Sequence, residues 1–185
     1  MELLQGLLER SSQPVLAEPG PDLKHIEQAI RAALCAPDHR ALQPWRYLVV
    51  SGAARERLAA IYAASQQAAQ PQRSAAEIER LRQQPLRAPT LIVAILRPSQ
   101  DAAVPMHEQW LSMGAAVQNL LLALHAQGFA AIWRTGALAT DTAVRSALGV
   151  QVEESIAALV YVGSPPPTPR RAERPQAQSF WRVWS

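Results

Sequence analysis

A short polar segment between two prolines, Pro37 and Pro44, carries side chains well suited to binding a ligand. It holds His39, the amide of Gln43 and an arginine, which together offer hydrogen bonds and positive charge. Proline lacks a backbone N–H and disfavours helix in the residue before it, so a helix must end before Pro37. An apolar, strand-like run begins at Trp45. We therefore expect a rigid helix-to-strand loop that positions ligand-binding groups, with a solvated connection as the alternative.

The sequence lacks the common signatures of catalysis by protein side chains alone. It contains no Gly-rich phosphate loop, no Gly-x-Ser-x-Gly elbow, no His-Glu-x-x-His motif and no paired Cys-x-x-Cys metal site. The histidines are far apart in the sequence, and His125 occupies a position typical of a satisfied core histidine. Cys35 and His39 could act as nucleophile and base only across Pro37, which is poor geometry. If the protein is an enzyme, we expect a bound cofactor to do the chemistry.

Length and cysteine content indicate one domain in a reducing compartment. A chain of 185 residues can bury on the order of 70% of its unfolded surface, so it needs no metal or disulfide for stability. Cys35 is the single cysteine of the sequence, which excludes an intramolecular disulfide. The first residues lack the basic region of an export signal. We therefore expect a cytoplasmic location.

Charge and hydropathy argue against two classes of partner. The net charge is +3, but the arginines are scattered and form no basic stripe interleaved with aromatic residues, which disfavours nucleic acid. The longest apolar stretch, residues 110–129, is interrupted by polar side chains that a lipid-facing helix would rarely carry together. These are Gln118, Asn119, His125 and Gln127. We expect neither a nucleic-acid-binding nor a membrane-spanning protein.

Periodicity, caps and breakers predict the elements that position the polar loop. The helix before it begins after Asp22, a good N-cap, and Cys35 lies outside its apolar stripe. That stripe is Leu23, Ile26, Ile30, Ala33 and Leu34. Ser74 and Glu77 form a capping box for a later helix. Helices are expected over residues 3–10, 23–34, 53–69, 75–84, 106–127 and from 140 or 141 to 149, strands over 45–51, 90–96, 129–133 and 156–162, and a loop over 101–105.

Two of these elements are expected to be deeply buried. Residues 90–96 form a continuous apolar run of strand length, which is typical of a central strand buried on both faces. Beyond Trp110, the helix over 106–127 is apolar on nearly every side, and Gly128 suits the position just after its C-terminus. We expect such a helix to be covered all round, by its own sheet and by a partner subunit.

The C-terminal residues differ in composition from the rest of the chain. Residues 164–171 are rich in proline and favour an extended conformation that cannot enter a sheet interior. The tip of this arm is apolar: it holds Phe180, Trp181, Val183 and Trp184. We therefore expect one domain, 1–185, made of a core over 1–163 and a Pro-rich arm over 164–185. Since an apolar tip is costly to leave in water, the arm should dock on its own core or on a second subunit.

Several short motifs, in order and at characteristic separations, give the sequence a family resemblance. They are Ala36-Pro37-Asp38-His39 with Gln43-Pro44-Trp45-Arg46, Arg87-Ala88-Pro89, Gln127-Gly128-Phe129, and Ile132-Trp133-Arg134-Thr135-Gly136-Ala137-Leu138. In these motifs the sequence resembles the small FMN-dependent NAD(P)H nitroreductases of the YdjA type. The match is collinear from about Leu3 to Gly163 and weak in the arm.

This resemblance implies an α+β nitroreductase-like fold, with a central mixed or antiparallel β-sheet flanked by helices. It implies a homodimer that binds two FMN molecules at the subunit interface. The expected all-round apolar helix agrees with a dimer, and the C-terminal arm would dock on the partner. The resemblance also implies that the flavin takes a hydride from NAD(P)H and passes reducing equivalents to a small-molecule acceptor such as a nitro compound or a quinone.

The resemblance further implies a set of cofactor-binding residues. Arg10 and Ser12 match an N-terminal Arg-x-Ser element that holds FMN, and His39 matches a histidine that contacts it. A loop that lies against the flavin is matched by Trp133, Arg134 and Thr135. The stretch from Ala123 to Gly128 matches one associated with the nicotinamide cofactor. Guanidinium groups pair bidentately with phosphate, and no side chain need act as an acid or a base.

Arginines that the family carries near the flavin are replaced in this sequence. Ser11 and Val15 stand where arginines are usual, and Cys35 stands where close relatives carry a phosphate-pairing arginine. One charge-assisted bond to phosphate contributes roughly 1.5–3 kcal/mol, so losing two would weaken FMN binding by about a hundredfold or more. Arg31 lies one turn before Cys35 on the same helix face and could reach the phosphate instead. On that hypothesis, Arg31→Ala lowers the affinity for FMN.

Two alternative functions remain open. Related proteins use the same fold and flavin to dehalogenate substrates or to consume the flavin itself. A protein of another class would be a dimer that has lost FMN together with those arginines and serves as a non-catalytic binding protein. The flavin content of the purified protein separates the last alternative from the enzymes. NAD(P)H oxidation with and without a nitroaromatic compound separates the two kinds of enzyme.

Overall fold

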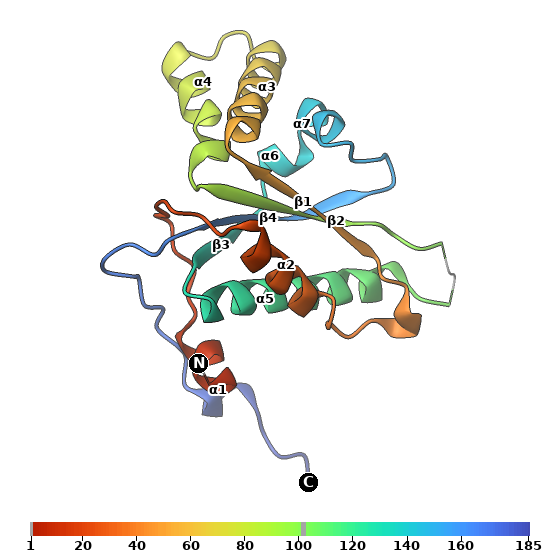
Figure 1. Cartoon of the computed structure of the whole chain (residues 1–185). Helices are drawn as coiled ribbons and strands as arrows, with labels where there is room; N and C mark the ends of the chain where they lie inside the picture. The colour runs from red at the N-terminus through yellow and green to blue at the C-terminus, as the bar shows by residue number, and fades with distance from the viewer. Residues whose placement is uncertain (1, 101–102) are drawn as a thin grey trace.

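Four antiparallel strands form the centre of the molecule (Figure 1). The computed structural model describes residues 2–100 and 103–185, so residues 101 and 102 of the loop predicted over 101–105 lie outside the described residues. The strands are β1 (Trp45–Ser51), β2 (Thr90–Leu96), β3 (Ala130–Arg134) and β4 (Ser155–Gly163). They lie in the order β1-β2-β4-β3, and each neighbouring pair is antiparallel. The α+β fold class is confirmed, and the sheet is antiparallel rather than mixed.

Strand β2 is buried over its whole length, as its continuous apolar sequence predicts. It pairs with β1 on one side and with β4 on the other. Because side chains alternate along a strand, Ile92 and Ala94 join one core cluster, whereas Leu91 and Val93 join the second. Within the described chain, β3 pairs with β4 alone, so β3 is an edge strand.

Helices cover both faces of the sheet (Figure 1). One face is covered by α2 (Leu23–Ala33) and α5 (Met106–Ala126), the other by α3 (Ala53–Ala69), α6 (Ala137–Thr140) and α7 (Thr142–Ala147), with α4 (Ala75–Arg82) packed on α3. The remaining elements are α1 (Leu3–Glu9) and three 3₁₀ turns, η1 (His39–Ala41), η2 (Gln84–Leu86) and η3 (Ala177–Phe180). Each face of the sheet therefore has its own hydrophobic core.

Local capping signals in the sequence place the helix ends. The carboxylate of Asp22 accepts a 2.8 Å hydrogen bond from the backbone N–H of His25 at the start of α2. Ser74 and Glu77 form the predicted capping box of α4, and Gly128 follows α5 with a φ of 87°. The four-residue helix α6 was not predicted, because it is too short to show a helical period.

The predicted apolar stripe of α2 is wrong in part, and the predicted cover of α5 is provided only in part by the single chain. In α2, Leu23 is 79% exposed and Leu34 is also exposed, whereas Ala29 is fully buried. Small alanines on the α5-facing side bring α2 close to α5, which turns the two leucines outward. In α5, Leu111 is 70% exposed, so a single chain does not cover this helix all round. The expected cover by a partner subunit stays a prediction.

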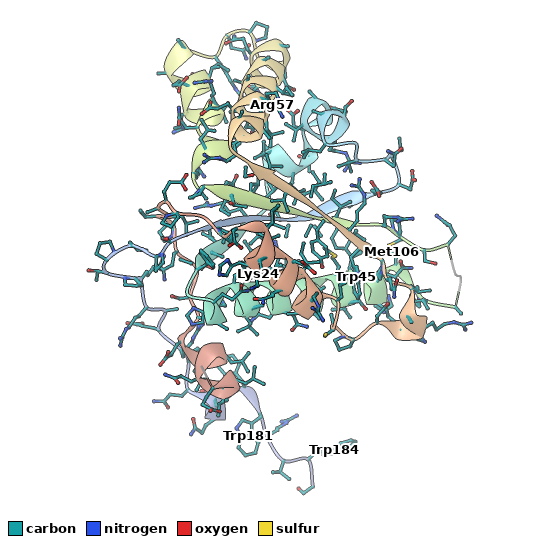
Figure 2. All side chains as sticks on the ribbon, in the orientation of Figure 1. Lys24, Trp45, Arg57, Met106, Trp181 and Trp184 are labelled. Carbon is teal, nitrogen blue, oxygen red and sulfur yellow. The ribbon has the colours of Figure 1, made fainter. Side chains whose placement is uncertain are left out.

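The two ends of the chain carry exposed apolar side chains. Helix α1 exposes Leu3, Leu4 and Leu8, and Trp184 in the arm is 97% exposed. Figure 2 shows Trp181 and Trp184 at the end of the arm, away from the sheet and its covering helices. The arm tip thus does not dock on its own core, which leaves a second subunit as the expected site. None of the helices in the described residues is long and apolar enough to cross a membrane.

Candidate functional site

The segment after α1 runs along the edge of the sheet beside β3. The backbone N–H of Gln13 donates to the carbonyl of Ala131 over 3.1 Å. Ala17 and Ser164 form two reciprocal backbone hydrogen bonds of 3.1 and 2.8 Å. These contacts hold the predicted Arg-x-Ser element, residues 10–12, at the exposed edge of the sheet.

A cavity of about 530 Å³ opens beside this segment, and we call it cavity one. Arg10 and Gly128 from the predicted site line it, together with His125 of α5. Arg170 and Arg171 of the C-terminal arm line it as well. Its volume lies within the range of about 300–1,000 Å³ that is usual for small-molecule sites.

Cavity one combines a fixed positive charge with a neutral imidazole. Burial lowers the pKa of Arg10, and the nearby Arg174 lowers it further, yet a guanidinium remains protonated in proteins. Burial also lowers the pKa of His125, with a smaller effect of Arg10 that Glu9 opposes. His125 Nε2 is buried and has no hydrogen-bond partner among the described residues. The prediction of a satisfied core histidine is therefore wrong, and this nitrogen is available to a ligand.

A second cavity, of about 510 Å³, lies at the other end of β3, and we call it cavity two. Arg134 and Thr135 from the predicted flavin loop line it. Arg73 and Arg87 contribute two more guanidinium groups, and Tyr62 contributes a phenol. The two cavities therefore lie at the two ends of the same edge strand, and both are rich in arginine.

Two tyrosine hydroxyls at cavity two remain protonated at neutral pH. Burial raises the pKa of Tyr161 to about 12, and burial with the nearby Asp141 raises the pKa of Tyr62. The hydroxyl of Tyr62 is buried without a hydrogen-bond partner in the described part of the chain. Cavity two thus offers hydrogen-bond donors and positive charge on a largely polar wall, which also includes Gln66 and Gln84.

Three other residues assigned by resemblance line neither cavity. Trp133 is half-exposed, and its ring N–H donates to the carbonyl of Ala157 over 3.2 Å. Ser12 is exposed, although its chain neighbours Ser11 and Gln13 both line cavity one. Ala123 is half-buried on α5, and its carbonyl accepts a 3.0 Å hydrogen bond from the Gln127 side chain. The structure therefore brings together only part of the predicted set.

His39 lies at the opposite end of α5 from cavity one, and Cys35 lies just after α2, which packs along α5. His39 Nδ1 lies 2.6 Å from Glu108 Oε2, near the start of α5. Cys35 is exposed, and its thiol donates to the carbonyl of Arg31 over 3.4 Å. The 17 residues from Glu108 to His125 span about 25 Å at 1.5 Å per residue, which exceeds the reach of one flavin mononucleotide.

The loop that carries His39 is held in an unusual backbone conformation. Arg40, Ala41 and Gln43 have φ values of 61°, 51° and 51°, which non-glycine residues rarely adopt. The backbone N–H of Gln43 donates to the Asp38 carboxylate over 2.6 Å, which fixes the turn. Strain of this kind is concentrated at functional sites. The predicted loop between a helix and a strand is confirmed, whereas its role in binding a ligand stays a prediction.

The residues that line the cavities fit FMN. Arg10, with the buried unpartnered His125 Nε2, suits a phosphate and its ester oxygens at cavity one. Arg134 and the unpartnered Tyr62 hydroxyl suit the polar edge of an isoalloxazine ring at cavity two. Sequence reasoning missed Tyr62, Arg73 and the buried Gln13, since only the tertiary fold brings them to the site. Arg87 was quoted within a motif without a role, and that motif was the available signal.

Comparison with known proteins finds relatives over most of the chain. The model of the nitroreductase family matches residues 9–164. A protein of Escherichia coli K12 named "Putative NAD(P)H nitroreductase YdjA" is 38% identical over 165 residues, which are 89% of each chain. The structure of a nitroreductase-like family protein from Bacillus cereus matches with a TM-score of 0.82 and 18% identity, covering 100% of this chain and 96% of that one.

A second solved structure that matches is of an enzyme described by its cofactors. It is a variant of the FMN- and NADPH-dependent nitroreductase NfnB from Sphigopyxis sp. strain HMH, with a TM-score of 0.80, 17% identity and full coverage of both chains. At such identities these structures show the fold. The family match over most of the chain and the relative at 38% identity show family membership as well. This chain belongs to the nitroreductase family.

Proposed function

We propose that this protein is an FMN-dependent NAD(P)H oxidoreductase that reduces a small acceptor such as a nitro compound or a quinone. The observation that carries the proposal is the pair of arginine-rich cavities at the two ends of β3, one lined by Arg10 and the other by Arg134 and Thr135. Bound FMN would supply the redox chemistry, accepting a hydride from NAD(P)H and passing electrons to the acceptor.

The protein residues would bind and orient the cofactor rather than react. Arg10 would pair with the phosphate, and the neutral His125 ring would meet an oxygen of the ribityl phosphate. Arg134 and the Tyr62 hydroxyl would hold the isoalloxazine edge, where fixed hydrogen bonds orient a ring for hydride transfer. No described side chain needs to gain or lose a proton in this scheme.

The separation of His39 from cavity one favours a site shared between two subunits. If both Arg10 and His39 contact FMN, as the family resemblance implies, one chain would have to bridge the length of α5, because Glu108 beside His39 and His125 beside Arg10 are about 25 Å apart along that helix. A second copy would bring its own His39 and Cys35 to the flavin. We therefore propose a homodimer with two FMN sites, in the cytoplasm, where the exposed Cys35 thiol stays reduced.

The absorption spectrum of the protein tests this proposal. We expect flavin bands in the visible spectrum after incubation with FMN and desalting, together with NAD(P)H oxidation that a nitroaromatic compound or a quinone accelerates. Protein that stays colourless would support a non-catalytic dimer and would refute the enzyme. Flavin bands without acceleration by either acceptor would favour a dehalogenase or a flavin-consuming enzyme.

Deletion of residues 180–185 is expected to weaken the dimer by at least tenfold in dissociation constant. The deletion removes four apolar side chains, Phe180, Trp181, Val183 and Trp184, which are exposed in the single chain and would bury their surface on the partner. Sedimentation at several protein concentrations measures the effect. Gln178→Ala, a polar change in the same arm, serves as the control and should leave the dimer intact. An unchanged profile for the deletion would show that the arm tip does not dock on the partner.

A further inference from the structure

Cavity two carries positive charge that no carboxylate in its lining balances. Arg73, Arg87 and Arg134 line it, and none of its lining residues is acidic. None of these three arginines forms an ion pair with a carboxylate in the part of the chain that the structure describes. Because a guanidinium stays protonated in proteins, the cavity suits a ligand that carries negative charge.

Arg73, in the connection between α3 and α4, is held in place by amides rather than by a carboxylate. Its Nη1 donates to Gln66 Oε1 over 2.6 Å, and its Nε donates to Gln70 Oε1 over 2.8 Å. The Gln66 Nε2 in turn donates to Asp141 Oδ2 over 2.9 Å, which fixes the amide that orients the guanidinium. Since a guanidinium has five N–H donors, Arg73 is positioned and still has donors for a ligand.

The cofactor contacts of the proposed function leave two of these arginines without a role. Arg134 and the Tyr62 hydroxyl hold the isoalloxazine edge in that scheme, whereas Arg73 and Arg87 take no part in it. The cavity volume of about 510 Å³ is within the range of small-molecule sites. Two further cations next to the flavin edge therefore fit a second ligand, which is a small anion.

Such an anion has two possible sources, the acceptor and the phosphates of NAD(P)H. The phosphates of NAD(P)H are remote from its reacting nicotinamide ring, whereas the charged group of a small acceptor is close to the atom that is reduced. Leu81 and Leu138 line cavity two together with the arginines. Apolar side chains next to cations suit an aromatic ring that bears a carboxylate better than they suit a diphosphate. These features favour the acceptor.

We propose that Arg73, oriented by Gln66 and acting with Arg87, selects an aromatic acceptor that carries a carboxylate, such as a nitrobenzoate. The inference rests on the proposed function, because it names the substrate class of that same site. The reaction would consume one hydride from NAD(P)H and one proton from solvent. It would convert the nitro group into a nitroso group with release of one water, and the carboxylate would stay unchanged as the group that is recognised.

Paired measurements with 4-nitrobenzoate and its neutral analogue 4-nitrobenzamide test this selection on the FMN-loaded protein. Calorimetric titration without NAD(P)H gives the two dissociation constants, and steady-state assays give kcat/KM for each acceptor. We expect the wild-type protein to prefer the carboxylate by about tenfold or more in both measurements, because a hydrogen bond to a charged group is stronger than one to an amide.

Variants of Arg73 test the residue itself. Arg73→Gln removes the charge and keeps a polar side chain, so it should weaken 4-nitrobenzoate by about tenfold and 4-nitrobenzamide by less than about twofold. Arg73→Lys keeps the charge and should retain part of the preference. Arg57→Gln removes an exposed arginine of α3 that does not line cavity two, and this matched control should leave both constants unchanged. The urea midpoint and FMN content of each variant show whether it is folded and loaded.

Each outcome decides for or against the proposal. Equal affinity of the FMN-loaded wild-type protein for the two probes would overturn the inference and leave the proposed function intact. A full preference for the carboxylate in Arg73→Gln would overturn the role of Arg73. A raised KM for NADPH in that variant, with the preference unchanged, would assign the guanidinium to a cofactor phosphate instead. Wild-type protein that binds no FMN would refute the proposed function together with this inference.

Discussion

Replacing Arg46 by alanine is expected to lower the free energy of unfolding by about 3–5 kcal/mol. The Arg46 guanidinium pairs with Glu154 in a two-point geometry, Nε to Oε1 over 2.7 Å and Nη2 to Oε2 over 2.6 Å. It also donates to the Gly149 carbonyl over 2.9 Å. Glu154 is 4% exposed, so the variant would leave a buried carboxylate without its cation. This pair ties the start of β1, next to the His39 loop, to the turn before β4.

Urea unfolding at several pH values measures this effect. The hydrogen bond from Arg46 lowers the pKa of Glu154, so the stability that it contributes is present above the unfolded value of about 4.3 and is lost as the pH falls through the folded value. The deficit of the Arg46→Ala variant should therefore be largest at neutral pH and shrink in acid. Arg82→Ala, which breaks an exposed pair with Glu56, should cost less than about 1 kcal/mol. Equal losses in both variants would contradict the prediction.

Gly163→Ala is expected to damage both stability and flavin binding. A Cβ atom at this position would lie 2.7 Å from the Ala17 carbonyl oxygen and 2.8 Å from Pro89 Cδ. Neither neighbour is the free end of a flexible side chain, and Ala17 is held by its two hydrogen bonds to Ser164. We expect a loss of about 1–3 kcal/mol from overpacking. Because the shift would move the segment that carries Arg10, FMN affinity should fall by about tenfold or more.

Gly114→Ala provides the matched control for Gly163→Ala. It adds the same methyl group in the interior of α5, where nothing beyond the helix's own nearby backbone lies within 4 Å of the new Cβ. Replacing a helical glycine by alanine should raise the free energy of unfolding by about 0.5–1 kcal/mol. Urea unfolding and FMN titration of the two variants measure the contrast. A Gly163→Ala protein as stable as wild type, with normal FMN affinity, would show that the Ala17–Ser164 contact does not control the site.

Local sequence signals predicted most of the secondary structure because those signals act over a few residues. Asp22 and the Ser74–Glu77 capping box set helix starts through bonds to backbone groups three positions away. The apolar run of β2 predicted a central strand, and the strand is fully buried. The burial of α2 was predicted less well, because the alanine face that meets α5 depends on the partner helix rather than on the apolar stripe alone.

The site could be predicted only in part, for a physical reason. Motifs identified Arg10, His39 and Arg134 as members of one family site, but spacing along a chain carries no information on distances in space. The fold places Arg10 and Arg134 at two cavities along one edge strand and sends His39 to the far end of α5.

By itself, the sequence determined most of the helices and strands and the membership of the nitroreductase family, since these depend on local chemistry or on collinear motifs. Only the tertiary structure decided which arginines surround each cavity. The hydrogen bonds between the Gln13 side chain and the Arg170 backbone join residues 157 positions apart, and no local rule connects them. Such a contact exists because the sheet edge brings the two ends of the chain together, and it is formed through packing rather than through any pattern in the sequence.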